Sequence, residues 1–402
     1  MNNIKKIHMM GIGGSGMSGV AYLAEKMGYI VTGCDLEEST AYTKNIFKGH
    51  SPDHLKDIDL LVVSPAVFYQ NSDNPELLEG KKRGMVITWQ EFVGRYMTDG
   101  KKLICVAGTH GKSTTTAMVG KLLIDVGLNP TVLVGAKVPE WNGNARYGTG
   151  EYFVLEADEF NNNFLFYHPD IIVLNNIEFD HPDFFKDEEE VRSSFDKFIG
   201  NLKGEKILIT LNDSLDKHFN LKVMGEYNQK NANMVFALGK KLGISDEEIT
   251  KSLESFEGIG RRMELIADRN GVKVYDDYAH HPTAIKLTLE GVRERFSDAK
   301  ILVIDEPHGY KRTKALLSEY GGVFGSVNKV IIGPIFQARD EVDSSITPEG
   351  VVKALKHKNA IGLNSFKEII EEVNNESRKY DIIVVMGAGK SYLWAKEIAK
   401  II

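Results

Sequence analysis

Short runs of apolar and β-branched residues alternate with longer helical patterns along the whole chain. Most of these runs are hydrophobic at every position, which is typical of strands that are buried on both faces of a sheet. Strands that alternate with helices indicate parallel sheets joined by crossover helices. The sequence therefore predicts an α/β fold, with strands that include Lys6–Met10, Leu60–Ser64, Leu103–Ala107, Tyr152–Glu156, Ile171–Asn175, Lys206–Leu211, Lys300–Ile304, Lys329–Ile332 and Ile382–Met386.

A chain of 402 residues is longer than one hydrophobic core usually organises, so two or three domains are expected. Composition changes at two places. A polar stretch at 97–102 separates a helical pattern from a new strand, and a glycine-rich turn at 256–262 follows another helical pattern. We therefore predict three domains, at 1–97, 98–257 and 258–402.

The net charge of −7 and the pI near 5.9 provide no overall positive field for nucleic acid, so any bound anion must be held locally by loops and helix ends. Glycines interrupt the apolar N-terminal stretch, and no apolar run approaches the ~18 residues of a membrane span. These features predict a cytoplasmic protein that binds no membrane. The distant Cys34 and Cys105 indicate buried reduced thiols rather than a disulfide or a metal-binding pair.

The first candidate site is the glycine loop that follows the strand KKIHMM and begins a helix. Glycines at this point allow backbone N–H groups to approach a diphosphate at the positive end of the helix. Asp35 ends the next strand, where an acidic residue commonly contacts a ribose hydroxyl. The ligand is either NAD or a UDP-sugar, and a glycine turn needed only for packing is the alternative. The loop residues are Gly11, Gly13, Gly14, Ser15 and Gly16.

A second loop lies between the strand KLICVA and a helix, which is the arrangement of a nucleotide phosphate loop. Its backbone amides are expected to surround phosphates, Lys112 to neutralise the β and γ oxygens, and Ser113 to bind Mg²⁺. Val106 stands where the general pattern has its first glycine. The predicted ATP-binding residues here are Gly108, Thr109, His110, Gly111, Lys112, Ser113 and Thr114.

Two later strands end in acidic residues, at the edge where open α/β sheets bind ligands. A triphosphate and a substrate carboxylate repel each other, so a reaction between them needs a bridging cation. We assign Glu159 and His181 to hold Mg²⁺ there; solvated acidic turns are the alternative. Asn228 and Asn231 begin a helix and either contact adenine or cap that helix. The paired histidines of the segment 274–283 do not form an obvious zinc site, since no third ligand is apparent.

Taken together and in this order, the motifs resemble those of the Mur ligases. Within that family, the resemblance is to the branch that contains UDP-N-acetylmuramate–L-alanine ligase (MurC) and the murein peptide ligase Mpl. The resemblance extends over nearly the whole chain. It rests on GIGGSGMSG, SPAVFYQNSDNPEL, GTHGKSTTT, ADE, NNIEFDHPD, GEYNQKNA, GIGRRMEL, DDYAHHPTAI, PHGYKRTKALL and MGAG.

The resemblance implies an N-terminal Rossmann-like domain for the UDP-sugar, a central P-loop ATPase-type domain, and a C-terminal Rossmann-like domain that closes on ATP and the amino acid. It places Ser64 with the glycine loop and Asp35 at the UDP-sugar. It further implies that Arg261 contacts the phosphates, Asp277 the ribose, and His281 and Arg312 the reacting acid or amine. The implied reaction is the ATP-dependent joining of an amino acid to UDP-N-acetylmuramate through an acyl phosphate, for peptidoglycan synthesis, by a monomer or homodimer.

The sequence departs from the family pattern at three places: Gly309 replaces an arginine, Tyr227 a histidine, and Lys390-Ser391 an acidic residue. The chain is also shorter than the family norm. L-alanine is the predicted amino acid, a short peptide the second candidate, and another acid in place of the sugar acid the third. The alternatives of other classes are an NAD-dependent oxidoreductase, a P-loop kinase or ATPase, and a non-catalytic UDP-sugar-binding protein.

Overall fold

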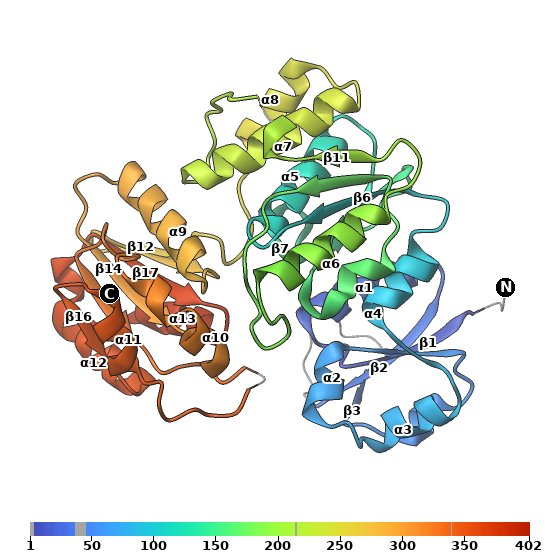
Figure 1. Ribbon diagram of the computed structural model, residues 1–402, viewed down its shortest axis with the longest axis horizontal. Coiled ribbons are helices and arrows are strands. Elements are labelled where there is room, and N and C mark those ends of the chain that lie inside the picture. Colours follow the sequence, from blue (N-terminus) through green and yellow to red (C-terminus); the bar gives the residue numbers. More distant parts are fainter. Residues whose placement is uncertain (1–3, 37–45, 214, 339) are drawn as a thin grey trace. The chain divides into compact units, whose positions relative to one another are not determined.

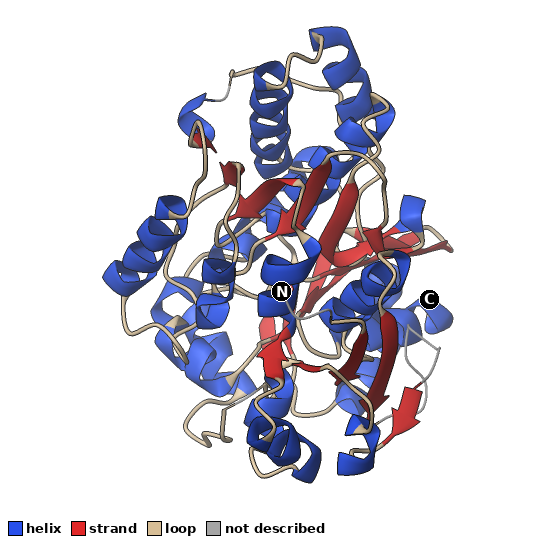
Figure 2. Ribbon diagram, turned by 90° about the vertical axis from the view of Figure 1, so that its right-hand side faces the viewer, coloured by secondary structure: helices blue, strands red, loops and turns tan. Residues whose placement is uncertain are grey.

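The computed structural model describes residues 4–36, 46–213, 215–338 and 340–402. Their strands form three sheets, of five, six and six strands, with helices packed against the strands (Figures 1 and 2). The α/β fold predicted from the sequence is therefore confirmed. The chain divides into two compact units, and the first contains the first two sheets. The second unit consists of Ile177–Arg192, Asp216–Ala232 and Glu254–Ile402.

The first sheet is parallel throughout and has the strand order β3-β2-β1-β4-β5. The chain adds β2 and β3 on one side of β1 and then β4 and β5 on the other, so the C-terminal end of β1 is a topological switch point, where open α/β sheets bind ligands. The strands are β1 (Lys6–Met10), β2 (Ile30–Asp35), β3 (Ile46–Lys48), β4 (Leu60–Val63) and β5 (Val86–Thr88), and the helices are α1 (Ser15–Lys26), η1 (Pro52–Leu55), α2 (Pro65–Gln70), α3 (Pro75–Lys82), α4 (Trp89–Phe92) and η2 (Val93–Met97).

The second sheet has the order β11-β10-β6-β9-β7-β8, and its edge strand β8 pairs antiparallel with β7. All its other pairs are parallel. The strands are β6 (Lys102–Ala107), β7 (Thr131–Val138), β8 (Gly143–Arg146), β9 (Tyr152–Glu156), β10 (Ile171–Leu174) and β11 (Ile207–Ile209). The helices between and after them are α5 (Lys112–Asp125), η3 (Pro139–Trp141), η4 (Phe160–Phe166), α6 (Glu188–Gly200), η5 (Leu211–Asp213), α7 (Glu226–Lys241) and α8 (Asp246–Ser255).

The third sheet has the order β12-β13-β17-β14-β15-β16, with β12 antiparallel to β13. Apolar side chains are buried on both faces of it, as the continuous apolar runs predict. The strands are β12 (Glu264–Arg269), β13 (Val272–Asp277), β14 (Ile301–Glu306), β15 (Lys329–Ile332), β16 (Ala360–Gly362) and β17 (Ile382–Gly387), and the helices are α9 (Pro282–Arg295), α10 (Tyr310–Ala315), η6 (Leu317–Tyr320), α11 (Pro348–Leu355), α12 (Phe366–Glu376), η7 (Ser377–Lys379) and α13 (Ser391–Ile401).

The predicted strands are present, with differences at their ends. The strand predicted to end at Ser64 ends at Val63, because Ser64 is the N-cap residue of α2. The strand predicted at 206–211 is limited to Ile207–Ile209. The predicted parallel sheets are correct except for the antiparallel edge strands β8 and β12, which the sequence prediction missed.

Candidate active site

The glycine loop after β1 is held by the end of β2. The N–H groups of Gly11 and Ile12 both donate to the Cys34 carbonyl, at 2.9 and 3.2 Å, and the Gly13 N–H donates to Asp35 Oδ2 at 2.9 Å. Gly11 has φ +81°, and a Cβ added to it would lie 3.0 Å from Ser64 Cβ. The predicted UDP-sugar residues thus gather at the ends of β1, β2 and β4: Gly11, Gly13, Gly14, Ser15, Gly16, Asp35 and Ser64.

The loop between β6 and α5 has the form of a phosphate loop. Gly108 and Gly111 have positive φ angles of +134° and +83°, which other residues rarely adopt. Asn176, just past the end of the neighbouring strand β10, fixes the loop from outside. Its Oδ1 accepts the His110 N–H at 2.8 Å, its Nδ2 donates to the His110 carbonyl at 3.1 Å, and its own carbonyl accepts the Thr109 N–H at 3.1 Å.

Lys112 is the first residue of α5, and its ammonium group lies across this loop. It donates to the Gly108 carbonyl at 2.7 Å and to Glu159 Oε2 at 2.8 Å. Burial alone would lower the pKa of Lys112, but the negative charges of Glu159 and Asp158 raise it above its usual value. The side chain is therefore positively charged at neutral pH, as an interaction with phosphate oxygens requires.

Glu159 is almost completely buried, and burial raises the pKa of its carboxyl to about 7 although Lys112 acts in the opposite direction. Next to it, Ser113 Oγ donates to Glu156 Oε1 at 2.9 Å. Glu156 ends β9, the strand beside β6, so it belongs to the site although the prediction did not include it. Its signal was available, because an acidic residue at the end of a strand adjacent to a phosphate loop commonly faces that loop.

In the second unit, Arg312 forms a buried pair with Asp180. Arg312 Nη2 lies 2.7 Å from Asp180 Oδ1 and 3.2 Å from His181 Nδ1. Burial alone would raise the pKa of Asp180, but His181 and Arg312 lower it well below its usual range. His181 has φ +56°, so its backbone is held in a left-handed conformation. The structure thus brings together the predicted His181 and Arg312, with Asp180 as a partner that the sequence reasoning did not select.

His281 is the N-cap residue of α9. Its Nδ1 accepts the Thr283 N–H at 3.2 Å, so Nε2 carries the proton and donates to the Phe179 carbonyl at 3.3 Å. The neighbouring His280 is half-buried, and burial together with Arg312 lowers its pKa well below the usual value. The imidazole of His281 is therefore oriented by backbone groups, beside the segment that carries Asp180.

Arg261 links two strands of the third sheet and the start of helix α13. Its Nε donates to Asp276 Oδ2 at 3.2 Å, and its Nη2 donates to the Gly387 carbonyl at 2.6 Å and to Ser391 Oγ at 3.0 Å. Asp277 is buried and accepts the N–H groups of Met263 and Ala279, both at 2.8 Å. These contacts hold the C-terminal ends of β13 and β17 together, at the edge where ligands of this sheet are expected.

Comparisons with known proteins give the family. The models described as "Mur ligase family, catalytic domain", "Mur ligase middle domain" and "Mur ligase, glutamate ligase domain" match residues 6–101, 106–222 and 261–389. A protein named UDP-N-acetylmuramate–L-alanine ligase from Caldicellulosiruptor bescii is 35% identical, over 96% of this chain and 96% of its own. The chain belongs to the Mur ligase family. This membership replaces the oxidoreductase and P-loop kinase alternatives.

Other relatives agree. A protein of the same name from Acetivibrio thermocellus is 35% identical over 97% of this chain and 95% of its own. The crystal structure of UDP-N-acetylmuramate-alanine ligase MurC from Thermotoga maritima has a TM-score of 0.80 and 27% identity, covering 98% of each chain. A murein peptide ligase from Psychrobacter arcticus, at 23% identity and a TM-score of 0.70 over 99% of each chain, shares the fold. The predicted resemblance is thus confirmed. Within the described residues, no helix of this Mur ligase is both long and apolar enough to span a bilayer.

Two of the three departures from the family pattern, at Gly309 and at Lys390-Ser391, have structural counterparts in this Mur ligase. Gly309 has φ +82° and ψ 134°, a conformation in which a side chain is strained, and it is the N-cap residue of α10. Two residues later, the backbone N–H of Lys311 donates to Asp340 Oδ2 at 2.5 Å. At the third departure, the Ser391 N–H donates to Glu306 Oε2 at 3.0 Å. The carboxylate of Glu306 therefore lies at the N-terminus of α13.

Asn228 and Asn231 lie on α7 and are both buried. Asn228 Nδ2 donates to the Met224 carbonyl at 2.7 Å, and Asn231 Nδ2 donates to Asn228 Oδ1 at 3.2 Å. These contacts stabilise the start of α7. A contact of these residues with adenine stays a prediction. The convergence of Glu159 and His181 on one Mg²⁺ ion also stays a prediction, as do the UDP-sugar, ribose and amino-acid contacts.

Proposed function

We propose that this Mur ligase joins L-alanine to UDP-N-acetylmuramate, with hydrolysis of ATP to ADP and phosphate. The observation that carries the proposal is the phosphate loop with Lys112 fixed between its carbonyls and Glu159, in a chain whose full-length relatives bear that name. A binding protein for UDP-sugar alone would have no use for this loop. The remaining alternatives are a murein peptide in place of L-alanine and another acid in place of the sugar acid.

The residues around Lys112 fit the phosphates of ATP. Gly108 and Gly111 adopt positive φ angles, and a Cβ on Gly108 would lie 2.9 Å from the Asn176 carbonyl oxygen, so the loop needs glycine to hold its conformation. Lys112 adds a positive charge in a largely buried position, where charge interactions are stronger than in water. In the proposed reaction Lys112 stabilises the negative charge that spreads over the γ-phosphate oxygens.

The proposed first step forms an acyl phosphate. A carboxylate oxygen of the sugar acid attacks the γ-phosphorus, and the bond between that phosphorus and ADP breaks. In the second step the amine nitrogen of L-alanine attacks the acyl carbon, phosphate leaves, and the amine loses a proton. We propose that Arg312, held by Asp180, and the oriented imidazole of His281 contact the reacting acid or amine, that Arg261 contacts the phosphates, and that Asp277 contacts the ribose.

Mg²⁺ would reduce the repulsion between the triphosphate and the substrate carboxylate when it is bound. Ser113, Glu159 and His181 are the side chains proposed to hold it. Ser113 Oγ and the Glu159 carboxylate are hard oxygen donors that suit this ion, and the His181 imidazole is the one nitrogen donor of the proposed set. We also propose the domain boundaries at 1–97, 98–257 and 258–402, since each range contains one complete sheet.

The test measures phosphate release by the purified protein with ATP, Mg²⁺ and UDP-N-acetylmuramate. We expect release only after L-alanine is added, together with a product whose mass equals the sum of the two substrates less water. Release that needs the murein tripeptide instead of L-alanine would favour the peptide ligase. Equal release with and without any amine would refute the ligase proposal.

A further inference from the structure

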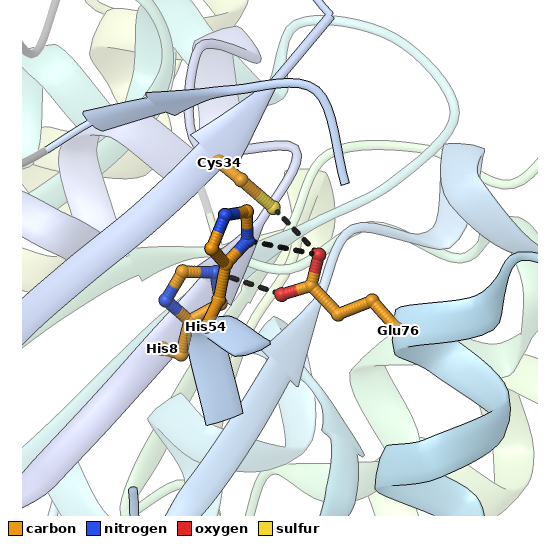
Figure 3. A group of neighbouring side chains, drawn as sticks. All are labelled: His8, Cys34, His54 and Glu76. Atoms are coloured by element: carbon orange, nitrogen blue, oxygen red, sulfur yellow. Dashed lines mark hydrogen bonds and ion pairs between the residues drawn. The ribbon is translucent and has the colours of Figure 1, made fainter. Parts of the chain in front are cut away.

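A cluster of potential metal ligands lies in the domain of the first sheet, apart from the residues assigned above. His8 comes from β1, Cys34 from β2, His54 from η1 and Glu76 from α3, so four separate segments contribute one side chain each. Figure 3 shows that the four side chains point toward one another, with the Glu76 carboxylate facing the two imidazoles and the thiol. One ligand atom from each of the four lies within 4.8 Å of all the others.

The closest separations involve the carboxylate of Glu76. Its Oε1 lies 3.0 Å from His8 Nε2, and its Oε2 lies 3.2 Å from His54 Nδ1 and 3.4 Å from Cys34 Sγ. Tetrahedral coordination by zinc at bond lengths of 2.0–2.3 Å places ligand atoms roughly 3.3–3.7 Å apart. The three separations that involve Glu76 therefore lie within a few tenths of an ångström of that range, and the remaining pairs of ligand atoms lie within 4.8 Å of one another.

The side chains of the cluster are largely shielded from solvent. The side chains of His8 and Glu76 are completely buried, and that of His54 is 13% exposed. The buried atoms His8 Nε2 and Glu76 Oε1 lie 3.0 Å apart as an ion pair. Imidazoles, a thiol and a carboxylate that converge in a buried place are the ligand types that zinc takes, so a bound ion is one explanation of their convergence.

Outer contacts already orient three of the four ligands. His8 Nδ1 lies 2.8 Å from Thr32 Oγ1, which leaves Nε2 facing the cluster. The Ser51 N–H donates to Glu76 Oε2 at 2.9 Å, and the ring of His54 stacks on Phe47 with centroids 4.5 Å apart. Hydrogen bonds to the second atom of a ligand are the usual support of a metal site.

We propose that His8, Cys34, His54 and Glu76 bind one structural zinc ion. Two imidazoles, one thiolate and one carboxylate form a closed four-ligand set that suits zinc, and the thiolate is a soft ligand that Mg²⁺ and Ca²⁺ do not select. On binding, the Cys34 thiol releases its proton to solvent and its sulfur becomes a ligand. The ion would connect η1 and α3 to the sheet. One of its ligands, Cys34, directly precedes Asp35, whose side chain accepts a hydrogen bond from the glycine loop.

The proposal is tested with Co²⁺ and Zn²⁺ on the full-length protein, without nucleotide. After treatment with a chelator and dialysis, we expect one Co²⁺ per chain with the absorption of tetrahedral cobalt and a thiolate-to-cobalt band. Zn²⁺ should displace the cobalt and raise the Tm of the protein. The Cys105→Ser variant, which removes the other buried thiol, should behave like the unmodified protein, and Cys34→Ser should lose the thiolate band.

His54→Asn provides the test if Cys34→Ser does not fold, because His54 is at the edge of the cluster and partly exposed. We expect this variant to keep the circular dichroism of the unmodified protein and to lose the rise in Tm with Zn²⁺. His168, an exposed histidine outside the cluster, provides the control, and His168→Asn should retain the band. No thiolate band in the unmodified protein, or a band that survives in Cys34→Ser or in His54→Asn, would overturn the proposal.

Discussion

Replacement of Lys112 by methionine should remove the charge on which the proposed phosphoryl transfer depends. The ammonium group contacts the loop carbonyl of Gly108 and the carboxylate of Glu159, so no other cation among the described residues of the loop takes its place. Loss of one preorganised charge aimed at a transition state costs about 3–4 kcal/mol, which corresponds to roughly 10²–10³-fold in kcat. We therefore expect phosphate release to fall at least 10²-fold.

The effect of Lys112→Met on stability should be smaller than that on activity. A buried charge that loses its partner costs about 3–5 kcal/mol when it stays ionised. Burial, however, already raises the pKa of Glu159 to about 7, so Glu159 takes up a proton near neutral pH once Lys112 is absent. The expected loss in the free energy of unfolding is then about 1–3 kcal/mol. The double variant Lys112→Met with Glu159→Gln should recover part of that stability and no activity.

Two assays separate the role of Lys112 in turnover from any effect on UDP-sugar binding. Phosphate release measures turnover, and calorimetry measures binding of UDP-N-acetylmuramate, which we assign to the first sheet. Lys121→Met is the matched control, because Lys121 lies on the same helix and pairs with Asp125 at 3.0 Å, away from the loop. Turnover in Lys112→Met within tenfold of the unmodified protein would refute the role of Lys112. An equal loss of UDP-sugar binding would refute the assignment of the two ligands to different sheets.

Three further predictions concern the other buried groups. Asp180→Asn leaves Arg312 without its partner at 2.7 Å, so the free energy of unfolding measured in urea should fall by about 3–5 kcal/mol, whereas Glu188→Gln at an exposed pair should change it little. Burial raises the pKa of Asp305 to about 8, so the unfolded chain loses that proton at lower pH than the folded protein, and the free energy of unfolding falls as pH rises from about 4 to 8. In urea unfolding, Asp305→Asn should reduce this dependence of the free energy of unfolding on pH, and an unchanged dependence would contradict the prediction. Gly108→Ala should raise the KM for ATP at least tenfold, because its φ of +134° and the Asn176 backbone leave no room for a Cβ, and an unchanged KM would exclude that constraint.

The fold and the phosphate loop could be predicted from the sequence because both depend on local signals. Continuous apolar runs identify strands such as β6 and β17, and the lysine and serine after β6 follow directly from the strand and helix on either side. The antiparallel strands β8 and β12 could not be predicted in this way. Their register depends on pairing with a neighbour, and their side chains are mostly exposed or half-buried, so neither has a continuous apolar run.

Contacts between distant residues were the part that local patterns did not provide. Asp180 and Arg312 are 132 residues apart in the sequence, and each looks like an ordinary charged residue until the fold makes them a buried pair. The same is true of the cluster of His8, Cys34, His54 and Glu76, since the spacing of its members matches no short metal-binding pattern. Side chains that meet only through sheet order require the three-dimensional structure.

The three sheets share a constraint that explains where their site residues lie. Each central strand is followed or ended by a glycine with positive φ: Gly11 after β1, Gly108 after β6 and Gly387 at the end of β17. A Cβ at these positions would lie 3.0 Å or less from an atom of a residue at the end of a neighbouring strand or just past it, namely Ser64 Cβ, the Asn176 carbonyl oxygen and Glu306 Cβ. The ends of adjacent strands can therefore approach closely only if the central one ends in glycine. That close approach brings the loops of neighbouring strands to one edge, which is why residues far apart in the sequence meet there.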